Sequence, residues 1–191
     1  MNRTLHIFDF DDTLVKSDTL VRISHYDGAI SELTSSEFAG YTALDGDSYD
    51  FSEFETYPQN GMPISSMFKA LRDSLNMLGS NNVVILTARS NDVPVYDFLV
   101  DHGIDRSIEV VTVGSSDPTR KGEYVYDRVL NDGYDDIKVY EDNIKNINAI
   151  KNVLSDLDVN FSYVHVLEED EEYNDTLIRN IVRGIIMEKK Y

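Results

Sequence analysis

Two patterns of hydrophobic and polar positions alternate along the chain. Short continuous apolar runs indicate β-strands, and apolar residues that recur every three or four positions indicate helices. Continuous apolar strands are typical of a parallel sheet that is covered on both faces. The pattern therefore predicts an α/β fold, a Rossmann-like three-layer sandwich with a central parallel sheet of about five strands. The expected strands are residues 5–8, 83–86, 108–113, 137–140 and 161–166.

The expected helices have readable ends. Gly79 and Gly103 follow two of the helical stripes, at positions where helices commonly end in a left-handed residue. Asp117 and Pro118 suit the N-cap and the first turn of another helix. The helical stripes cover residues 64–78, 95–102, 118–130, 144–154 and 177–185.

Residues 16–61 interrupt this alternation. The stretch contains many Ser, Asp, Gly and Tyr residues and no long periodic helix. Residues 19–26 are expected to form a strand that turns at residues 27–28, and a short helix is expected to begin near residue 33. A long irregular segment in a compact domain is usually functional or disordered. We interpret it as a flap or small cap, inserted after the first strand of a single domain that spans residues 1–191.

The composition is that of an ordinary globular protein, with 41% hydrophobic residues. The apolar runs are far shorter than the ~20 residues that cross a bilayer, and the N-terminal residues lack the features of a secretory signal. We therefore expect a cytoplasmic protein with no membrane partner. The sequence contains no cysteine, which excludes disulfides, zinc–thiolate sites and a cysteine nucleophile.

The net charge is −18, from 35 acidic residues against 17 Lys and Arg. Such a surface repels polyanions at long range, so it disfavours nucleic acid and anionic membranes as partners without excluding a nucleic-acid end. It does not exclude a small phosphorylated substrate, because a site is governed by its local field. The acidic run at residues 168–172 is expected to be a solvated connection.

Acidic residues follow the first expected strand directly, at Asp9, Asp11 and Asp12. Burying such a group without a partner is costly, because the carboxylates repel one another and lose hydration. Mg²⁺ prefers oxygen ligands, and ligands of open α/β sheets bind beyond the carboxyl ends of the strands. The acids therefore stand where a Mg²⁺–phosphate site is expected. A solvated acidic loop with Thr13 as a helix N-cap is the alternative.

Residues 9–15 resemble the first motif of the haloacid dehalogenase-like (HAD) superfamily, Asp-x-Asp-x-Thr/Val-Leu/Val. The resemblance implies that Asp9 attacks phosphorus and forms an aspartyl phosphate. It implies that Asp11 protonates the leaving oxygen and then activates water. Dehalogenating members typically lack the second aspartate, so Asp11 favours phosphoryl chemistry. Asp12 occupies the variable position of the motif and receives no role from it.

A second segment, residues 83–89, resembles the HAD motif in which a strand ends in Thr or Ser. The resemblance implies that the Thr87 hydroxyl and the Ala88 amide hold the phosphoryl oxygens. Thr87 as a helix N-cap is the alternative. We expect Arg89 to form a surface salt bridge rather than to contact phosphate.

The remaining two motifs involve one basic and several acidic or amide residues. The resemblance places a lysine or arginine before the fourth strand, where it binds and neutralises the phosphate and also neutralises the nucleophilic aspartate. We assign this role to Lys121, with Arg120 as the competitor. It implies that Asp142 completes a Mg²⁺ shell with the Asp9 carboxylate and the Asp11 backbone carbonyl. Asn146 and Glu141 would not bind the ion themselves but would orient the residues that do. Helix-start roles for Asn143 and Asn146 stay open.

The four motifs occur in the expected order across residues 5–155 and predict a Mg²⁺-dependent phosphomonoesterase for a small phosphorylated metabolite, with a nucleotide as the first candidate. The alternatives are an end-processing phosphatase for nucleic acid and a catalytically inactive HAD-scaffold binding protein. Aromatic residues at 26, 41 and 51 either stack on a base or form the core of the cap. The four histidines lack metal-ligand spacing and are expected to be packing residues: His6, His25, His102 and His165.

Overall fold

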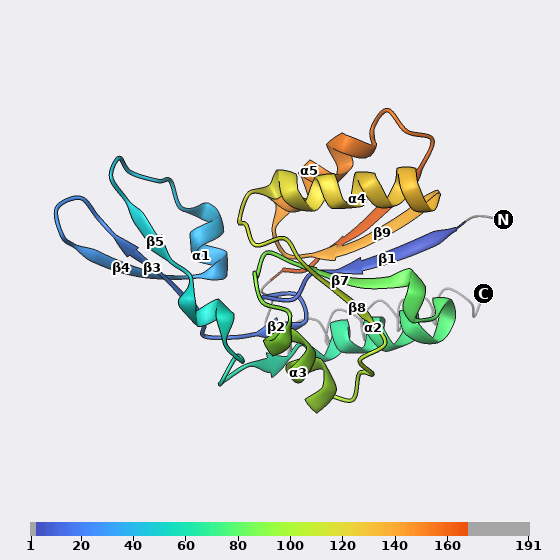
Figure 1. Ribbon diagram of the computed structural model, residues 1–191, viewed down its shortest axis with the longest axis horizontal. Coiled ribbons are helices and arrows are strands. Elements are labelled where there is room, and N and C mark those ends of the chain that lie inside the picture. Colours follow the sequence, from blue (N-terminus) through green and yellow to red (C-terminus); the bar gives the residue numbers. More distant parts are fainter. Residues whose placement is uncertain (1–2, 168–191) are drawn as a thin grey trace, which may run out of the picture.

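The computed structural model describes residues 3–167, and its centre is a five-stranded parallel sheet in the order β10-β9-β1-β7-β8 (Figure 1). All neighbouring strands of this sheet run parallel. This arrangement confirms the predicted α/β class and the predicted parallel sheet. The strands are β1 Thr4–Phe8, β7 Val83–Thr87, β8 Glu109–Thr112, β9 Asp136–Glu141 and β10 Asn160–His165.

Helices cover both faces of the sheet (Figure 1). The side chains of β1 alternate between the two cores, with Phe8 in one and Leu5 and Ile7 in the other. Burial on both faces explains the continuous apolar runs, since each fully buried aliphatic or aromatic side chain contributes about 1.5–3 kcal/mol. One core includes α2 Ser65–Leu78 and α3 Val93–Asp101, and the other includes α4 Pro118–Asp132 and α5 Ile144–Leu154.

The start of α4 follows the sequence prediction, whereas its end lies two residues beyond the expected residue 130. The Asp117 carboxylate accepts a hydrogen bond from the Thr119 amide at 3.0 Å and caps the helix. Gly133 ends it in the left-handed region, with φ 71°. These caps satisfy backbone groups that a helix terminus otherwise leaves unpaired. The expected helix at residues 177–185 and the acidic run at 168–172 lie outside the described residues.

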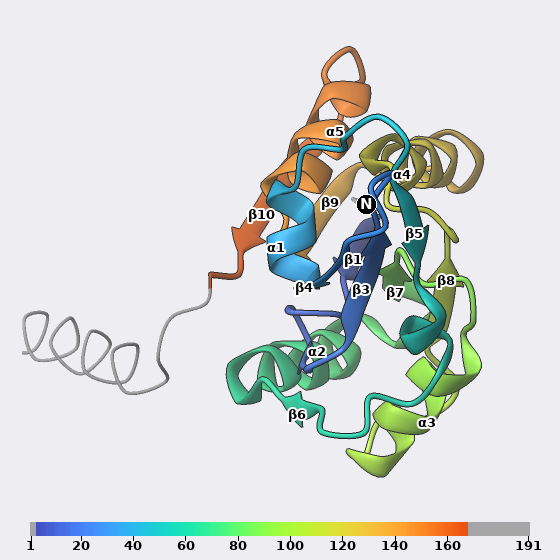
Figure 2. The same ribbon diagram turned by 90° about the vertical axis from the view of Figure 1, so that its left-hand side faces the viewer.

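Two small antiparallel sheets lie between β1 and α2 in the sequence. The first pairs β2 with β6, joining the two ends of the segment. The second has the order β4-β3-β5 and is accompanied by α1, and we call residues 20–50 the small sheet. Figure 2 looks onto the small sheet, with the strands of the central sheet behind it. The elements are β2 Val15–Lys16, β3 Leu20–Ser24, β4 Ile30–Thr34, α1 Ser35–Gly40, β5 Ser48–Asp50, the 3₁₀ turn η1 Ser52–Glu55 and β6 Met62–Pro63.

The short helix α1 starts later than its sequence suggests. Thr34 still pairs with Leu20 in the small sheet, and it also caps α1 in a reciprocal arrangement with Glu37. The helix therefore begins at Ser35. Within residues 3–167, no helix has the length and apolar character needed to cross a membrane.

Candidate functional site

Carboxylates gather where β1 and β9 end. Asp9 directly follows β1, Glu141 ends β9, and Asp142 comes next. The two strands are neighbours in parallel register, and the Asp9 amide donates to the Tyr140 carbonyl at 2.9 Å. One carboxylate oxygen from each of these three residues lies within 4.8 Å of the other two. We call Asp9, Glu141 and Asp142 the acidic cluster.

Lys121 reaches the acidic cluster from the start of α4. Its Nζ atom lies 2.6 Å from Asp9 Oδ1 and 2.7 Å from Glu141 Oε2. The lysine side chain is only 3% exposed. Its neighbour Arg120 instead pairs with Glu123 in solvent. The structure therefore directs Lys121, rather than Arg120, into the site.

One lysine does not neutralise the acidic cluster. Burial raises the pKa of the Asp9 carboxyl, and the charge of Glu141 raises it further, although Lys121 opposes both. Burial also raises the pKa of the Asp142 carboxyl, and Asp9 and Glu141 add to the effect. Burial alone would lower the pKa of Lys121, but Asp9 and Glu141 outweigh it and raise the pKa above its ordinary value.

The excess of buried negative charge suits a cation. Three carboxylates face one ammonium, and unpaired charge in a buried site is costly. A metal ion bound among the carboxylate oxygens would remove that cost. It would also favour the ionised form of the carboxyl groups over the protonated form. The oxygen-only donor set fits a hard divalent cation. The buried acidic cluster could therefore hold a metal ion.

Glu141 differs from its two partners, because protein donors already engage both of its oxygens. Oε2 accepts from Lys121, and Oε1 accepts from the Asn146 side chain at 3.0 Å and the Asn143 amide at 3.2 Å. Asn143 is the N-cap of α5, where it accepts from the Lys145 amide. Asn146, by contrast, contacts the acidic cluster through Glu141. Glu141 thus holds Lys121 in place.

The loop after β1 is folded inward. Thr13 is fully buried, and its hydroxyl donates to Asp142 Oδ1 at 3.2 Å. The amide of Leu14 donates back to the Phe10 carbonyl, and both of these side chains are buried. Because Asp9 is only 6% exposed, the alternative of a solvated acidic loop with Thr13 as a helix cap is wrong.

Arg89 lies in a different environment from the one that its sequence predicts. It is 3% exposed, and its guanidinium forms a two-point ion pair with Asp11, Nε to Oδ2 at 2.9 Å and Nη2 to Oδ1 at 2.7 Å. The expected salt bridge is therefore present, but its expected location at the surface is wrong. The physical reason is that β7 lies beside β1, so the residues that follow the two strands meet. The sequence does not show which strands are neighbours, and so gave no signal for this pair.

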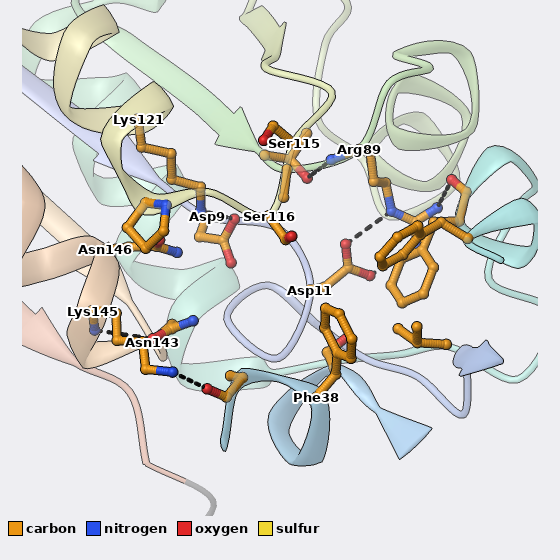
Figure 3. A pocket seen from close by; sticks show the side chains of 18 of the residues that line it. Asp9, Asp11, Phe38, Arg89, Ser115, Ser116, Lys121, Asn143, Lys145 and Asn146 are labelled. Carbon is orange, nitrogen blue, oxygen red and sulfur yellow. Dashed lines mark hydrogen bonds and ion pairs between the residues drawn. The ribbon is translucent and has the colours of Figure 1, made fainter. Parts of the chain in front are cut away.

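Thr87 and Ala88 lie at the carboxyl end of β7, at the wall of a cavity of about 570 Å³. Thr87 is buried, and its hydroxyl accepts from the Arg89 amide at 3.2 Å. It does not cap a helix, since α3 starts later, with Asp92 at its N-cap. Figure 3 shows Asp9, Lys121 and Asn146 grouped together in this cavity, and Asp11 facing Arg89.

Aromatic rings from the small sheet and the segment after it also line the cavity. Tyr41 and Phe51 are among them, and both also pack against Phe38, which agrees with the expected role as the core of the cap. Tyr26 is 90% exposed and is not among the lining residues, so its proposed stacking role is wrong. The sequence analysis missed three further rings because the segment has no periodic pattern: Phe38, Tyr49 and Phe54.

The histidines lie outside the acidic cluster. His6 contacts the Ser74 hydroxyl at 2.8 Å, and His102 contacts the Phe98 carbonyl of its own helix. His25 contacts Asp47 and Ser31 in the small sheet. His165 supports the site indirectly, through the Asp142 backbone carbonyl at 2.8 Å.

Neither family models nor curated proteins nor solved structures gave a match to this chain. A function must therefore be inferred from the geometry of the site. It combines a buried carboxylate fixed by a lysine, a second carboxylate fixed by an arginine, and a cation-attracting cluster. The cavity has room for a small molecule, and perturbed carboxyl groups in a cavity are typical of a catalytic site.

Proposed function

We propose that this chain is a Mg²⁺-dependent phosphomonoesterase that uses HAD-type chemistry on a small phosphorylated molecule. One observation carries the proposal: the Asp9 carboxylate is held by Lys121 at 2.6 Å beside Glu141 and Asp142, in a cavity that Asp11 also lines. A carboxylate fixed in this way is a suitable nucleophile for phosphorus.

The donor set favours Mg²⁺ over softer metals, because it consists of oxygen atoms. The Asp9 and Asp142 carboxylates would hold the ion, together with the Asp11 backbone carbonyl. A bound Mg²⁺ would offset the charge of the carboxylates and of the phosphate. Glu141 is assigned to Lys121 instead, since both of its oxygens already accept hydrogen bonds from the protein.

In the first step, an Asp9 oxygen attacks phosphorus and the bond from phosphorus to the leaving oxygen breaks. Asp11, in its protonated form, gives its proton to that oxygen. The Lys121 ammonium offsets charge beside Asp9, and the Thr87 hydroxyl and Ala88 amide donate to phosphoryl oxygens. The products are the free alcohol and an aspartyl phosphate on Asp9.

In the second step, water attacks the phosphorus of the aspartyl phosphate. Asp11, now a carboxylate, takes a proton from that water. The bond between phosphorus and the Asp9 oxygen breaks, and its electron pair returns to the carboxylate. Inorganic phosphate leaves, and both aspartates regain their starting forms.

We further assign the small sheet to the role of a cap over this site. Its residues Phe38, Tyr41 and Tyr49 line the same cavity as Asp9 and Lys121. A hydrogen bond from the Lys145 ammonium to the Ala39 carbonyl connects α5 with α1. A cap of this kind excludes bulk water during phosphoryl transfer. Its rings suit an apolar or flat leaving group, so nucleotides are the first substrates to test.

The test is a phosphate-release screen over nucleotides, sugar phosphates and phosphorylated DNA ends, with Mg²⁺ or with a chelator. We expect Mg²⁺-dependent release from at least one small ester, and loss of about 10³-fold or more in Asp9→Asn, which lacks the nucleophile. Asp73→Asn, on the exposed face of α2, is the matched control and should keep full activity.

Phosphate release by folded Asp9→Asn at the wild-type rate would remove Asp9 as the nucleophile. A preference for DNA ends, with activity that falls steeply as salt rises, would instead favour the end-processing alternative.

A further inference from the structure

Glu55 lies on the wall of the cavity, in the segment by which the chain returns from the small sheet. The loop after β7 holds this segment in place. Arg89 Nη1 donates to the backbone carbonyls of the residues on either side of Glu55, at 2.7 and 3.0 Å. The Asn91 side chain donates to the Glu55 carbonyl at 3.2 Å, and the Ser90 hydroxyl donates to Glu55 Oε1. Both the backbone and the carboxylate of Glu55 are therefore fixed.

The Glu55 carboxylate has no cationic partner within residues 3–167. Arg89 and Lys121 form their ion pairs with other carboxylates of the site. Lys145, the third basic residue that lines the cavity, donates to a backbone carbonyl of α1. In the part of the chain that the structure describes, no basic nitrogen lies within 4.0 Å of a Glu55 carboxylate oxygen. Glu55 thus adds an uncompensated negative charge to the wall.

The charges around the cavity leave no positive surplus for a second anion. Among the described residues, five acidic side chains and three basic ones line it. A divalent cation in the acidic cluster would balance that difference before any substrate binds. The phosphate that reacts then brings negative charge of its own. A second anionic group on the same substrate is therefore repelled, because fields in a cleft are weakly screened.

Glu55 lies on the side of the cavity that we assign to the leaving group. Figure 3 shows Lys121 on one side of the cavity and Arg89, which holds the segment of Glu55, on the other. Phe54 directly precedes Glu55, and its ring centre lies 6.4 Å from that of Phe51. Both rings line the cavity. The carboxylate therefore borders the aromatic wall rather than the lysine that is expected to meet the phosphate.

We propose that Glu55 is a specificity residue that favours phosphate esters with a flat, uncharged or cationic leaving group and disfavours those with a second anionic group. The substrate class is then a monoester with a single phosphate, such as a nucleoside monophosphate, rather than a bisphosphate or the end of a DNA strand. Glu55 acts on the leaving group and takes no part in phosphoryl transfer. The inference rests on the proposed function, because it names the ester that the same site hydrolyses.

The test compares three phenyl phosphates with a carbamoylmethyl, carboxymethyl or aminomethyl group in the para position. The amide and the acid have nearly the same shape, so these two esters differ mainly in the charge of the leaving group. At low salt, we expect wild-type kcat/KM to be about 10-fold lower for the acid than for the amide, and no lower for the amine than for the amide. Glu55→Gln keeps an oxygen for Ser90 and should reduce the amide-to-acid ratio about threefold or more.

Glu53→Gln is the matched control, because it removes the same charge two residues earlier and Glu53 is not among the described residues that line the cavity. It also keeps an oxygen for the Leu20 amide, and it should leave the ratio unchanged. Salt at about 0.5 M should reduce the wild-type ratio, because screening weakens the repulsion. A ratio that is independent of salt would indicate a steric cause and would overturn the inference.

The same ratio in Glu55→Gln as in the wild type, with circular dichroism showing both proteins folded, would also overturn the inference. So would faster wild-type turnover of the acid than of the amide, which would make Lys145 the residue that selects the leaving group. If the wild-type protein hydrolyses none of the three esters and no nucleotide, the proposed function itself fails. Wild-type turnover with an unchanged ratio in Glu55→Gln removes the role of Glu55 alone.

Discussion

Replacing Lys121 by methionine removes the ammonium that contacts Asp9 and Glu141 of the acidic cluster and keeps a side chain of similar length. Lys121 makes two short contacts, 2.6 Å to Asp9 and 2.7 Å to Glu141, and all three side chains are at most 8% exposed. Removing one partner of a buried ion pair typically costs about 3–5 kcal/mol, because it strands an uncompensated charge. For a domain of this size, that free energy corresponds to a loss of roughly 6–20 °C in Tm.

The assay is urea unfolding followed by circular dichroism, in a chelator so that bound metal does not offset the loss. The matched control is Lys69→Met, which breaks an exposed pair with Asp73 and should cost at most about 1 kcal/mol. Lys121→Met/Glu141→Gln should recover part of the loss, since one stranded carboxylate is gone. A loss in Lys121→Met no larger than that of Lys69→Met would refute the electrostatic reasoning.

Three further outcomes follow from the structure. Because burial raises the pKa of the Asp9 and Asp142 carboxyls, these two groups bind protons more tightly in the folded metal-free protein than in the unfolded chain, so stability should fall as pH rises above about 4. Melting curves in a chelator should show this, and Mg²⁺ should raise Tm more at pH 8 than at pH 5; an equal Mg²⁺ effect at both pH values would contradict it. Phe51→Ala should raise KM for nucleotides about two- to tenfold through lost stacking, whereas Tyr26→Ala, which alters an exposed ring, should not; equal KM values in the two variants would argue against a role for the ring at 51. Gly133→Ala should cost about 1–2 kcal/mol in urea unfolding, because the residue has φ 71° with open space around it, and Gly40→Ala, which also has open space but no such φ, is the control that should be near neutral.

The fold could be predicted well because its strands are buried on both faces. The resulting continuous apolar runs around residues such as Ile7 and Ile85 stand out from the polar connections. The meeting of Asp9 and Asp142 could also be anticipated, since the carboxyl ends of parallel strands share one edge of the sheet. The small sheet was harder, because its strands are short and half-exposed and Thr34 serves both a strand and a helix cap.

The parts of the site that depend on strand order and irregular backbone could not be predicted. The Arg89–Asp11 pair spans 78 positions of sequence and requires β7 to lie beside β1. Its burial also needs the carbonyls of Phe54 and Thr56, in a segment without a periodic pattern. Because lone arginines are usually exposed, the sequence analysis placed the Arg89 side chain at the surface. Only the assembled molecule shows the contact.

The short β2–β6 ladder has a wider consequence. It pairs Val15 with Pro63 and Lys16 with Met62, so the chain leaves the central body and re-enters it at nearly the same point. The segment between those two anchor points can change in length without altering the register of the parallel strands, provided that it still brings the Phe54 and Thr56 carbonyls to Arg89. If the small sheet is a cap, as we propose, sequence changes within residues 20–50 would alter which molecules reach the cavity, while β1 and β9 keep Asp9 and Asp142 in place.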